Sequence, residues 1–229
     1  LLRDWVRETG APVRVLEVPM GSGEAVRGLA EGIVHVAGVH GRRFASMAGV
    51  RENVRRLGDM TDPGARLVRV HFARWEIGVA VRSGNPRGVR GLEDLGRQDL
   101  RWVRRPANTA IASVYEAVLE GGIDRVRWTP VAAADHLQAA EMIAVGLADA
   151  GLTTAFAAHQ HELDFQPVED HRFDWILPIR RLSDPAVANL MDTLRTGAFR
   201  RQLETLWGYD AAGLGDIMEV EGSAWDGDG

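Results

Sequence analysis

The sequence predicts an α/β fold built mostly around parallel strands. Short apolar runs typical of buried strands alternate along the chain with helical stretches, which is the pattern of strand–helix–strand units. The 229 residues, 45% of them hydrophobic, suffice for one large domain or two small lobes. A parallel unit usually begins with a strand, whereas this chain begins with a helical pattern, so we expect an upstream strand outside this sequence.

The individual elements are predicted from hydrophobic periodicity and from the turn residues between the periodic segments. Helices are expected over residues 1–9, 21–31, 53–57, 92–95, from Thr109 onward, and over 135–145, 154–161, 184–194 and 198–206. Strands are expected over residues 13–18, 34–39, 67–72, 77–81, 100–103, 148–153, 165–168 and 173–178. The acidic, glycine-rich tail after Ile217 is expected to fray.

Composition excludes several kinds of chemistry. There is no cysteine, which rules out disulfides, thiolate catalysis and cysteine metal sites. The chain has 27 arginines and no lysine, so lysine Schiff bases are excluded and permanently cationic recognition must use guanidinium groups. The net charge of −5 disfavours direct nucleic-acid contact. With no apolar run long enough for a bilayer and no signal-peptide pattern, we expect a cytoplasmic protein without membrane contact.

Five segments in register resemble one family. The segments are "PMGSGEAVRGLAEGIVHVAGVH" (19–40), "VRSGNPRGVRGLEDL" (81–95), "AVGLADAG" (144–151), "LDFQPVEDHRFDWILP" (163–178) and "FRRQLETLWGYDAAGLGDI" (199–217). Together they are similar to the periplasmic-binding-protein-like domain of bacterial molybdate/tungstate-type helix-turn-helix regulators. Each motif alone is weak, but their order and spacing hold over most of the chain.

The resemblance implies a two-lobed type II periplasmic-binding-protein-like fold, with mostly parallel sheets, a central cleft and two hinge crossovers near residues 74–81 and 175–179. Lobe 1 would hold residues 1–76 plus 179–229, and lobe 2 residues 77–178. The implied function is a sensor or regulator domain that closes around a small anion or organic acid, with no cofactor and no metal. The resemblance also implies a partner for this domain, either a second copy in a homodimer or an N-terminal DNA-binding domain outside this sequence. One alternative is an enzyme of the lyase or dehydratase type acting on a small carboxylated metabolite, and another is a scaffold or subunit whose cleft is vestigial.

The first candidate site is Gly21-Ser22-Gly23, which leads into a helix. Free backbone N–H groups and the helix dipole favour an anion there, and the serine hydroxyl can donate to it. Ser22 acting as a simple N-cap is the competing interpretation.

The second candidate site is Arg104, Arg105, Asn108 and Thr109, at the position of the family pattern "NRxxGSGT-R". This chain lacks both glycines of that pattern and has alanine at position 112 in place of the later arginine. A tight glycine-built cradle is therefore not expected. We predict a reshaped anion-accepting pocket for a larger organic acid rather than molybdate, with Thr109 also able to cap a helix.

Further candidates lie on other segments. His136 is a ligand candidate, and with Asp135 it would be catalytic if the chain is an enzyme, but Asp135 is more readily a helix cap. His40 is expected at a strand end, as a ligand contact or a structural histidine. Arg74 would reach the cleft or pair with Glu76. We expect His159 and His161 to be surface residues rather than metal ligands. We expect Asp149 to form a hydrogen bond within a turn.

Overall fold

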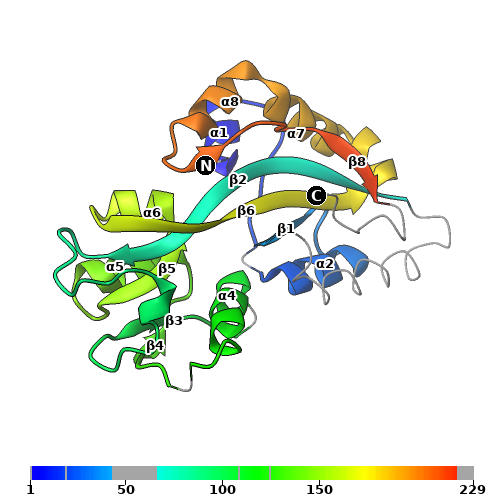
Figure 1. Ribbon diagram of the computed structural model, residues 1–229. Helices are drawn as coiled ribbons and strands as arrows, with labels where there is room; N and C mark the ends of the chain where they lie inside the picture. The colour runs from blue at the N-terminus through cyan, green and yellow to red at the C-terminus, as the bar shows by residue number, and fades with distance from the viewer. Residues whose placement is uncertain (1, 19, 43–65, 108, 124, 221–229) are drawn as a thin grey trace. The chain divides into compact units, whose positions relative to one another are not determined.

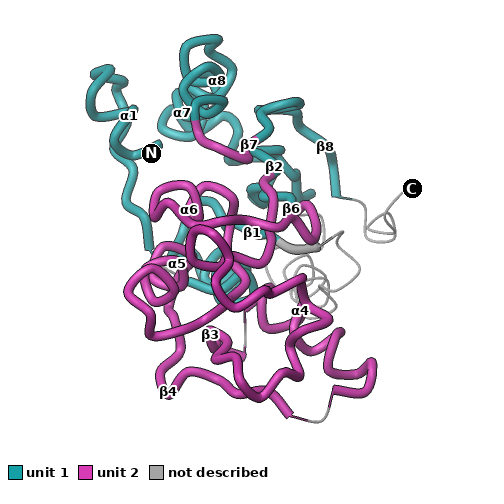
Figure 2. Tube along the Cα trace, turned by 60° about the vertical axis from the view of Figure 1, so that its left-hand side comes forward, with its two compact units in different colours: residues 1–74, 172–205, 210–229 teal, residues 75–171, 206–209 magenta. Residues whose placement is uncertain are grey.

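The computed structural model describes residues 2–18, 20–42, 66–107, 109–123 and 125–220. The chain divides into two compact units, coloured separately in Figure 2. Unit 1 comprises Leu1–Arg74, Arg172–Thr205 and Asp210–Gly229, and unit 2 comprises Trp75–His171 and Leu206–Tyr209. Strands β2 (Leu67–Val81) and β6 (Asp164–Pro178), drawn in Figure 1, are 15 residues each, and each contributes residues to both units.

Unit 1 contains parts of β2 and β6 together with elements from both ends of the chain. Its remaining elements are α1 (Leu2–Thr9), α2 (Ser22–Ala30), β1 (Ala37–Arg42), the 3₁₀ helix η3 (Ile179–Ser183), α7 (Pro185–Arg195), α8 (Gly197–Glu204) and β8 (Ile217–Val220). Strand β1 lies beside β6, and β8 pairs antiparallel with the start of β2. The core beneath α2 joins Val26 and Leu29 to Val39 and Ile176, all at most 5% exposed.

Unit 2 has the strand order β2-β5-β3-β4. It contains the 3₁₀ helix η2 (Leu92–Asp94), β3 (Trp102–Arg104), α4 (Ala110–Leu119), β4 (Trp128–Ala132), α5 (His136–Ala144), β5 (Ala150–Thr154) and α6 (Ala155–Gln160), while the short β7 (Tyr209–Asp210) pairs with β2. Strand β3 runs parallel to both β4 and β5, whereas β2 runs antiparallel to β5.

Helices cover both faces of the strands in unit 2. Ile111 of α4 packs in the same cluster as Val79, and Ile143 of α5 packs in the same cluster as Ala80. Because consecutive residues of a strand point to opposite faces, these two clusters lie on opposite sides of β2. The α/β class predicted from the alternation of elements is therefore confirmed.

Several predicted elements were wrong in detail. Residues 13–18 form no strand, and Leu16 is 87% exposed, so strand propensity was not supported by packing. The first described strand starts at Ala37 rather than residue 34. The two pairs of short strands expected over 67–81 and 165–178 are single long strands. The expected helix 53–57 lies outside the described residues.

Two regions of pairing were missed altogether. Strand β4 was not predicted, although it pairs with β3 from Trp102↔Trp128. The tail was expected to fray after Ile217, but Ile217–Val220 pairs with Val70–Leu67 of β2. Hydrogen bonds to that partner strand hold the tail as far as Val220, while residues 221–229 lie outside the described part.

Candidate functional site

The carboxyl ends of three parallel strands meet at one edge of unit 2. Strand β3 lies between β5 and β4, so this edge follows Arg104, Ala132 and Thr154. Helix α4 begins a few residues after β3, and α5 a few residues after β4. The first turn of each helix leaves backbone N–H groups without helical acceptors, which favours negative charge at this edge.

Arg105 is the first residue after β3 and is placed at this edge. It is only 8% exposed, and its Nε and Nη1 atoms have no hydrogen-bond acceptor among the described residues. A buried guanidinium normally has a carboxylate or several carbonyl oxygens as partners, because losing its hydration is costly. Arg105 is thus a buried cation whose Nε and Nη1 groups have no acceptor in the described part of the chain.

The electrostatics agree with that geometry. Burial lowers the pKa of the Arg105 guanidinium, and the negative charges that Tyr115 and Asp135 can carry act in the opposite direction. Tyr115 is itself fully enclosed, and burial raises the pKa of its phenol well above the ordinary value, so it stays neutral. Its hydroxyl accepts a 2.8 Å hydrogen bond from the Leu152 N–H. Neighbouring groups therefore offset only part of the cost of burying the Arg105 charge.

Thr109 and Asp135 begin the two helices. The Thr109 hydroxyl accepts from the Ala112 N–H at 3.2 Å and donates to the Pro106 carbonyl at 2.8 Å. Asp135 Oδ1 accepts from the Gln138 N–H at 2.8 Å. The predicted capping roles of both residues are confirmed, and the Thr109 hydroxyl uses its only hydrogen in the bond to the Pro106 carbonyl.

Arg104, although adjacent to Arg105, has a different environment. Its guanidinium donates to the Thr129 carbonyl at 3.0 Å and to the Pro130 carbonyl at 2.6 Å. Its backbone N–H also donates to Thr129 Oγ1 at 3.0 Å. These bonds connect β3 to β4, so the Arg104 guanidinium stabilises the pairing of the two strands.

His136 is the first residue of α5, beside the Asp135 cap. Its carbonyl accepts a 2.8 Å hydrogen bond from the Thr153 hydroxyl, which ties α5 to β5. The structure therefore brings Arg105, Thr109, Asp135 and His136 to the same edge. Asn108, which was predicted to join them, lies outside the described residues.

In unit 1 the structure brings Ser22 and His40 together. Ser22 Oγ accepts a 3.2 Å hydrogen bond from the His40 N–H. The N-cap of α2 is Gly21 rather than Ser22, so the interpretation of Ser22 as the cap was wrong. The Gly21 N–H donates to Glu24 at 3.3 Å, which leaves Ser22 and Gly23 in the first turn. His40 lies inside β1 and not at its end.

The other candidates lie elsewhere. Arg74 is exposed and is the last residue of the first segment of unit 1. His159 lies on α6 and stacks on Trp207, and His161 is the C-cap of the same helix. Asp149 accepts a 2.8 Å hydrogen bond from the Arg101 N–H, which confirms its role as a turn hydrogen-bonder.

Tyr115 was missed by the sequence analysis. It lies on the buried face of α4 with Ile111 and Val114, so its spacing predicts only a core residue. The hydroxyl of Tyr115, a polar group on an otherwise apolar helix face, is the one sequence feature that indicates a polar contact.

Comparisons with known proteins agree with this architecture. The PBP superfamily domain model matches residues 3–195. The uncharacterized protein YvgK of Bacillus subtilis (strain 168) is 27% identical over 147 residues, which cover 62% of this chain and 47% of YvgK. The chain thus spans about half the length of that relative.

Solved structures show the same fold at low sequence identity. The sulfate-binding protein SubI from Mycobacterium tuberculosis H37Rv has a TM-score of 0.61 at 15% identity, covering 91% of this chain and 81% of SubI. The effector-binding domain of a BenM variant has a TM-score of 0.54 at 14% identity, covering 91% and 90%. Among the described helices, none is long and apolar enough to cross a membrane. With its α/β architecture and a family match over most of its length, the chain belongs to the PBP superfamily and is a ligand-binding domain of that type.

Proposed function

We propose that this domain binds a small anion or organic acid and that the edge of unit 2 beside Arg105 holds the anionic group. The observation that carries the proposal is the buried Arg105 guanidinium without an acceptor among the described residues. A bound carboxylate or oxyanion would supply charge-assisted hydrogen bonds, and these are about twice as strong as neutral ones.

The helix starts support the same ligand class. The first turns of α4 and α5 begin at this edge, where the positive ends of their dipoles favour an anion. A planar guanidinium matches the geometry of a carboxylate. A cradle built from glycines would suit a tetrahedral anion, but those glycines are absent here. We therefore propose an organic acid rather than molybdate.

A sensor or regulator role is the second part of the proposal. SubI is named as a sulfate-binding protein, and the BenM domain is named as effector-binding. Similar folds thus occur both in anion binding and in effector recognition. A cytoplasmic location, a homodimer and a linked DNA-binding domain stay predictions.

The enzyme alternative depended on Asp135 and His136. Asp135 uses one carboxylate oxygen for the α5 cap, and the His136 carbonyl is bonded to Thr153. These contacts are those of helix-start residues, so we do not propose a reaction. The alternative stays a prediction, tested by looking for turnover of any acid that binds.

Calorimetry with the purified chain tests the proposal. The panel contains sulfate, molybdate, acetate, succinate and benzoate, with Arg105→Gln as the variant. We expect a carboxylate to bind, and Arg105→Gln to weaken binding by roughly tenfold or more, since a charge-assisted hydrogen bond is lost.

The matched comparison is Arg104→Gln, which removes the neighbouring guanidinium that bonds β4 carbonyls. An equal loss of affinity in both variants would contradict the assignment to Arg105. Tight molybdate binding without carboxylate binding would overturn the organic-acid part, and no binding across the panel would overturn the anion proposal.

A further inference from the structure

Unit 2 contains a cavity of about 430 Å³ formed by four segments of the chain. Ala155 and His159 come from α6, Glu76 from β2 and Trp207 from the segment 206–209. The start of β6 and the residue before it complete the lining with Leu163, Asp164 and Phe165. The volume lies within the range of about 300–1,000 Å³ that is usual for small-molecule sites.

One wall of the cavity is aromatic. The rings of His159 and Trp207 stack with centroids 5.0 Å apart and planes inclined by 13°. Trp207 is nevertheless 60% exposed, so much of its indole surface remains accessible. An indole face attracts cations through its negative quadrupole.

Apart from His159, which stacks on Trp207, the ionisable side chains of the described lining are acidic. Glu76 and Asp164 supply two carboxylates, and none of the lining residues that the structure describes is an arginine. Neither carboxylate forms an ion pair with another described residue, although Asp164 Oδ2 accepts a 2.9 Å hydrogen bond from the Gly84 N–H. This bond fixes one carboxylate without neutralising it.

The position of Glu76 is fixed by the backbone around it. Its N–H donates to the Gly208 carbonyl at 3.1 Å. Gly208 has a φ of +74°, and a Cβ added there would come within 2.5 Å of Ala155 Cβ and 3.4 Å of Glu76 Oε2. A glycine at 208 therefore allows the loop carrying Trp207 to pass close to α6 and to Glu76.

We propose that this cavity is a second ligand site, for a small organic cation of the alkylammonium class. The indole of Trp207 provides the aromatic face, Glu76 and Asp164 provide the opposite charge, and Phe165 and Leu163 provide apolar contact for alkyl groups. The ligand charge is opposite to that expected at Arg105, so the two sites select different molecules.

The test uses choline and its uncharged carbon analogue, 3,3-dimethylbutanol, which has nearly the same shape. Binding to the full chain is followed by NMR, through the Trp207 indole N–H signal identified by its loss in Trp207→Phe. We expect saturable choline binding, and roughly tenfold weaker binding of the neutral analogue, because it lacks the cation–π and carboxylate attraction.

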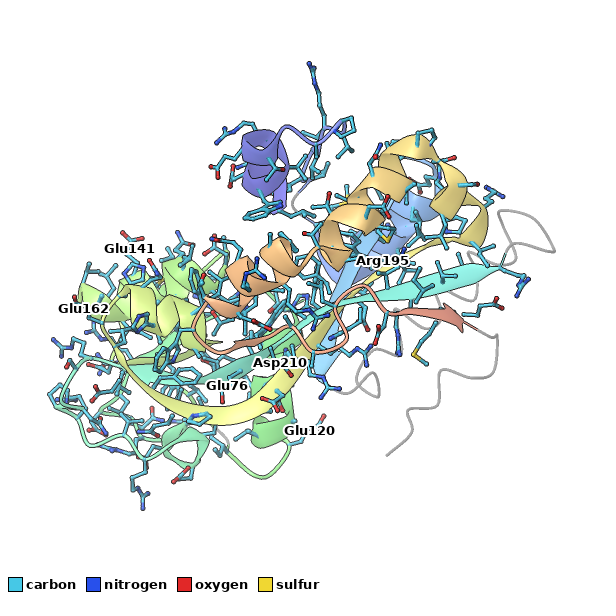
Figure 3. The ribbon with its side chains drawn as sticks, turned by 90° about the horizontal axis from the view of Figure 1, so that it is seen from above. Glu76, Glu120, Glu141, Glu162, Arg195 and Asp210 are labelled. Atoms are coloured by element: carbon cyan, nitrogen blue, oxygen red, sulfur yellow. The ribbon has the colours of Figure 1, made fainter. Side chains whose placement is uncertain are left out.

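The variants separate charge from shape. Glu76→Gln keeps the size of the side chain and should weaken choline binding several-fold, with an effect that diminishes as salt is raised. Glu141→Gln on α5 is the control for loss of one acidic charge, since Figure 3 shows it well away from Glu76. It should leave choline affinity unchanged.

Three outcomes would overturn the proposal: no saturable choline shift, equal binding of the neutral analogue, or unchanged affinity in Glu76→Gln. Unaltered circular dichroism of each variant shows that it folds. Arg105→Gln should retain choline binding, so failure of the anion proposal and failure of the cation proposal remain distinguishable.

Discussion

His71 on β2 and Asp174 on β6 form a buried pair in unit 1, with 2.7 Å between Nδ1 and Oδ1. Their side chains are 4% and 0% exposed. Arg172 Nε lies 2.9 Å from the same carboxylate, and Arg69 Nε lies 3.6 Å from it. One enclosed carboxylate thus contacts three basic side chains. Because two of these lie on β2 and the carboxylate lies on β6, the cluster connects the two long strands.

We predict that Asp174→Ala strongly destabilises the protein. The change removes the buried carboxylate that pairs with Arg172, and losing one partner of such a pair costs about 3–5 kcal/mol. The free energy of unfolding from urea titration measures the effect. Glu219→Gln, which disrupts the exposed pair with Arg66, is the control and should change it little. Similar losses in both variants would contradict a special role for the buried cluster.

The helix starts of unit 2 show how far local sequence can predict structure. Thr109 and Asp135 were recognised as caps because the capping signal lies within four residues of each helix start. Arg104 and Arg105 are neighbours of the same type, and nothing local distinguishes them. Only the tertiary structure shows that one bonds to β4 carbonyls and the other has no acceptor among described residues.

Pairings between distant segments were the least predictable part. Residues 217–220 look like the start of a fraying tail, yet they pair with residues 67–70 of β2. The stacking of Trp207 on His159 likewise joins segments that are far apart in sequence. Strand pairing depends on such remote partners more than on intrinsic propensity, so composition and periodicity could not identify these contacts.

Asp94 predicts a specific dependence of stability on pH. A hydrogen bond from the Arg90 guanidinium, assisted by the Arg90 N–H, lowers the pKa of this carboxyl to about 2. Because the pKa is lower in the folded state, the stabilisation is complete above the ordinary pKa of about 4. It is then lost as the pH falls through 2.

Asp94→Asn should therefore reduce the free energy of unfolding by about 1–2 kcal/mol at pH 6, a value lowered for the exposure of Arg90. The difference from the wild type should shrink steadily toward pH 2. Urea titrations of both proteins across this range measure it. A difference that stays constant with pH would show that the carboxyl is not selectively stabilised in its charged form.

Two glycines are expected to respond oppositely to alanine. A Cβ on Gly78 of β2 would lie 2.2 Å from the Gln166 carbonyl oxygen and 2.6 Å from the Phe165 ring. Backbone atoms cannot move aside cheaply, so Gly78→Ala should destabilise by about 1–3 kcal/mol. A Cβ on Gly28 of α2 has its nearest contact at 3.7 Å, so Gly28→Ala should stabilise by up to about 1 kcal/mol through helix propensity. Thermal denaturation distinguishes the signs, and a matching decrease in both would contradict the steric argument.

Arg105 links the proposed function to stability. If its guanidinium is buried for a ligand, the unliganded protein bears a desolvation cost that a neutral side chain of similar length would not. Arg105→Met should then raise the free energy of unfolding by about 1–3 kcal/mol without ligand, while removing the stabilisation by a bound carboxylate. Arg104→Met should have the opposite effect on stability, a loss of about 1 kcal/mol, because it breaks hydrogen bonds to the Thr129 and Pro130 carbonyls. Urea titration with and without the carboxylate identified by calorimetry measures both effects. If Arg105→Met instead destabilised the unliganded protein as Arg104→Met does, the guanidinium would serve the fold rather than a ligand.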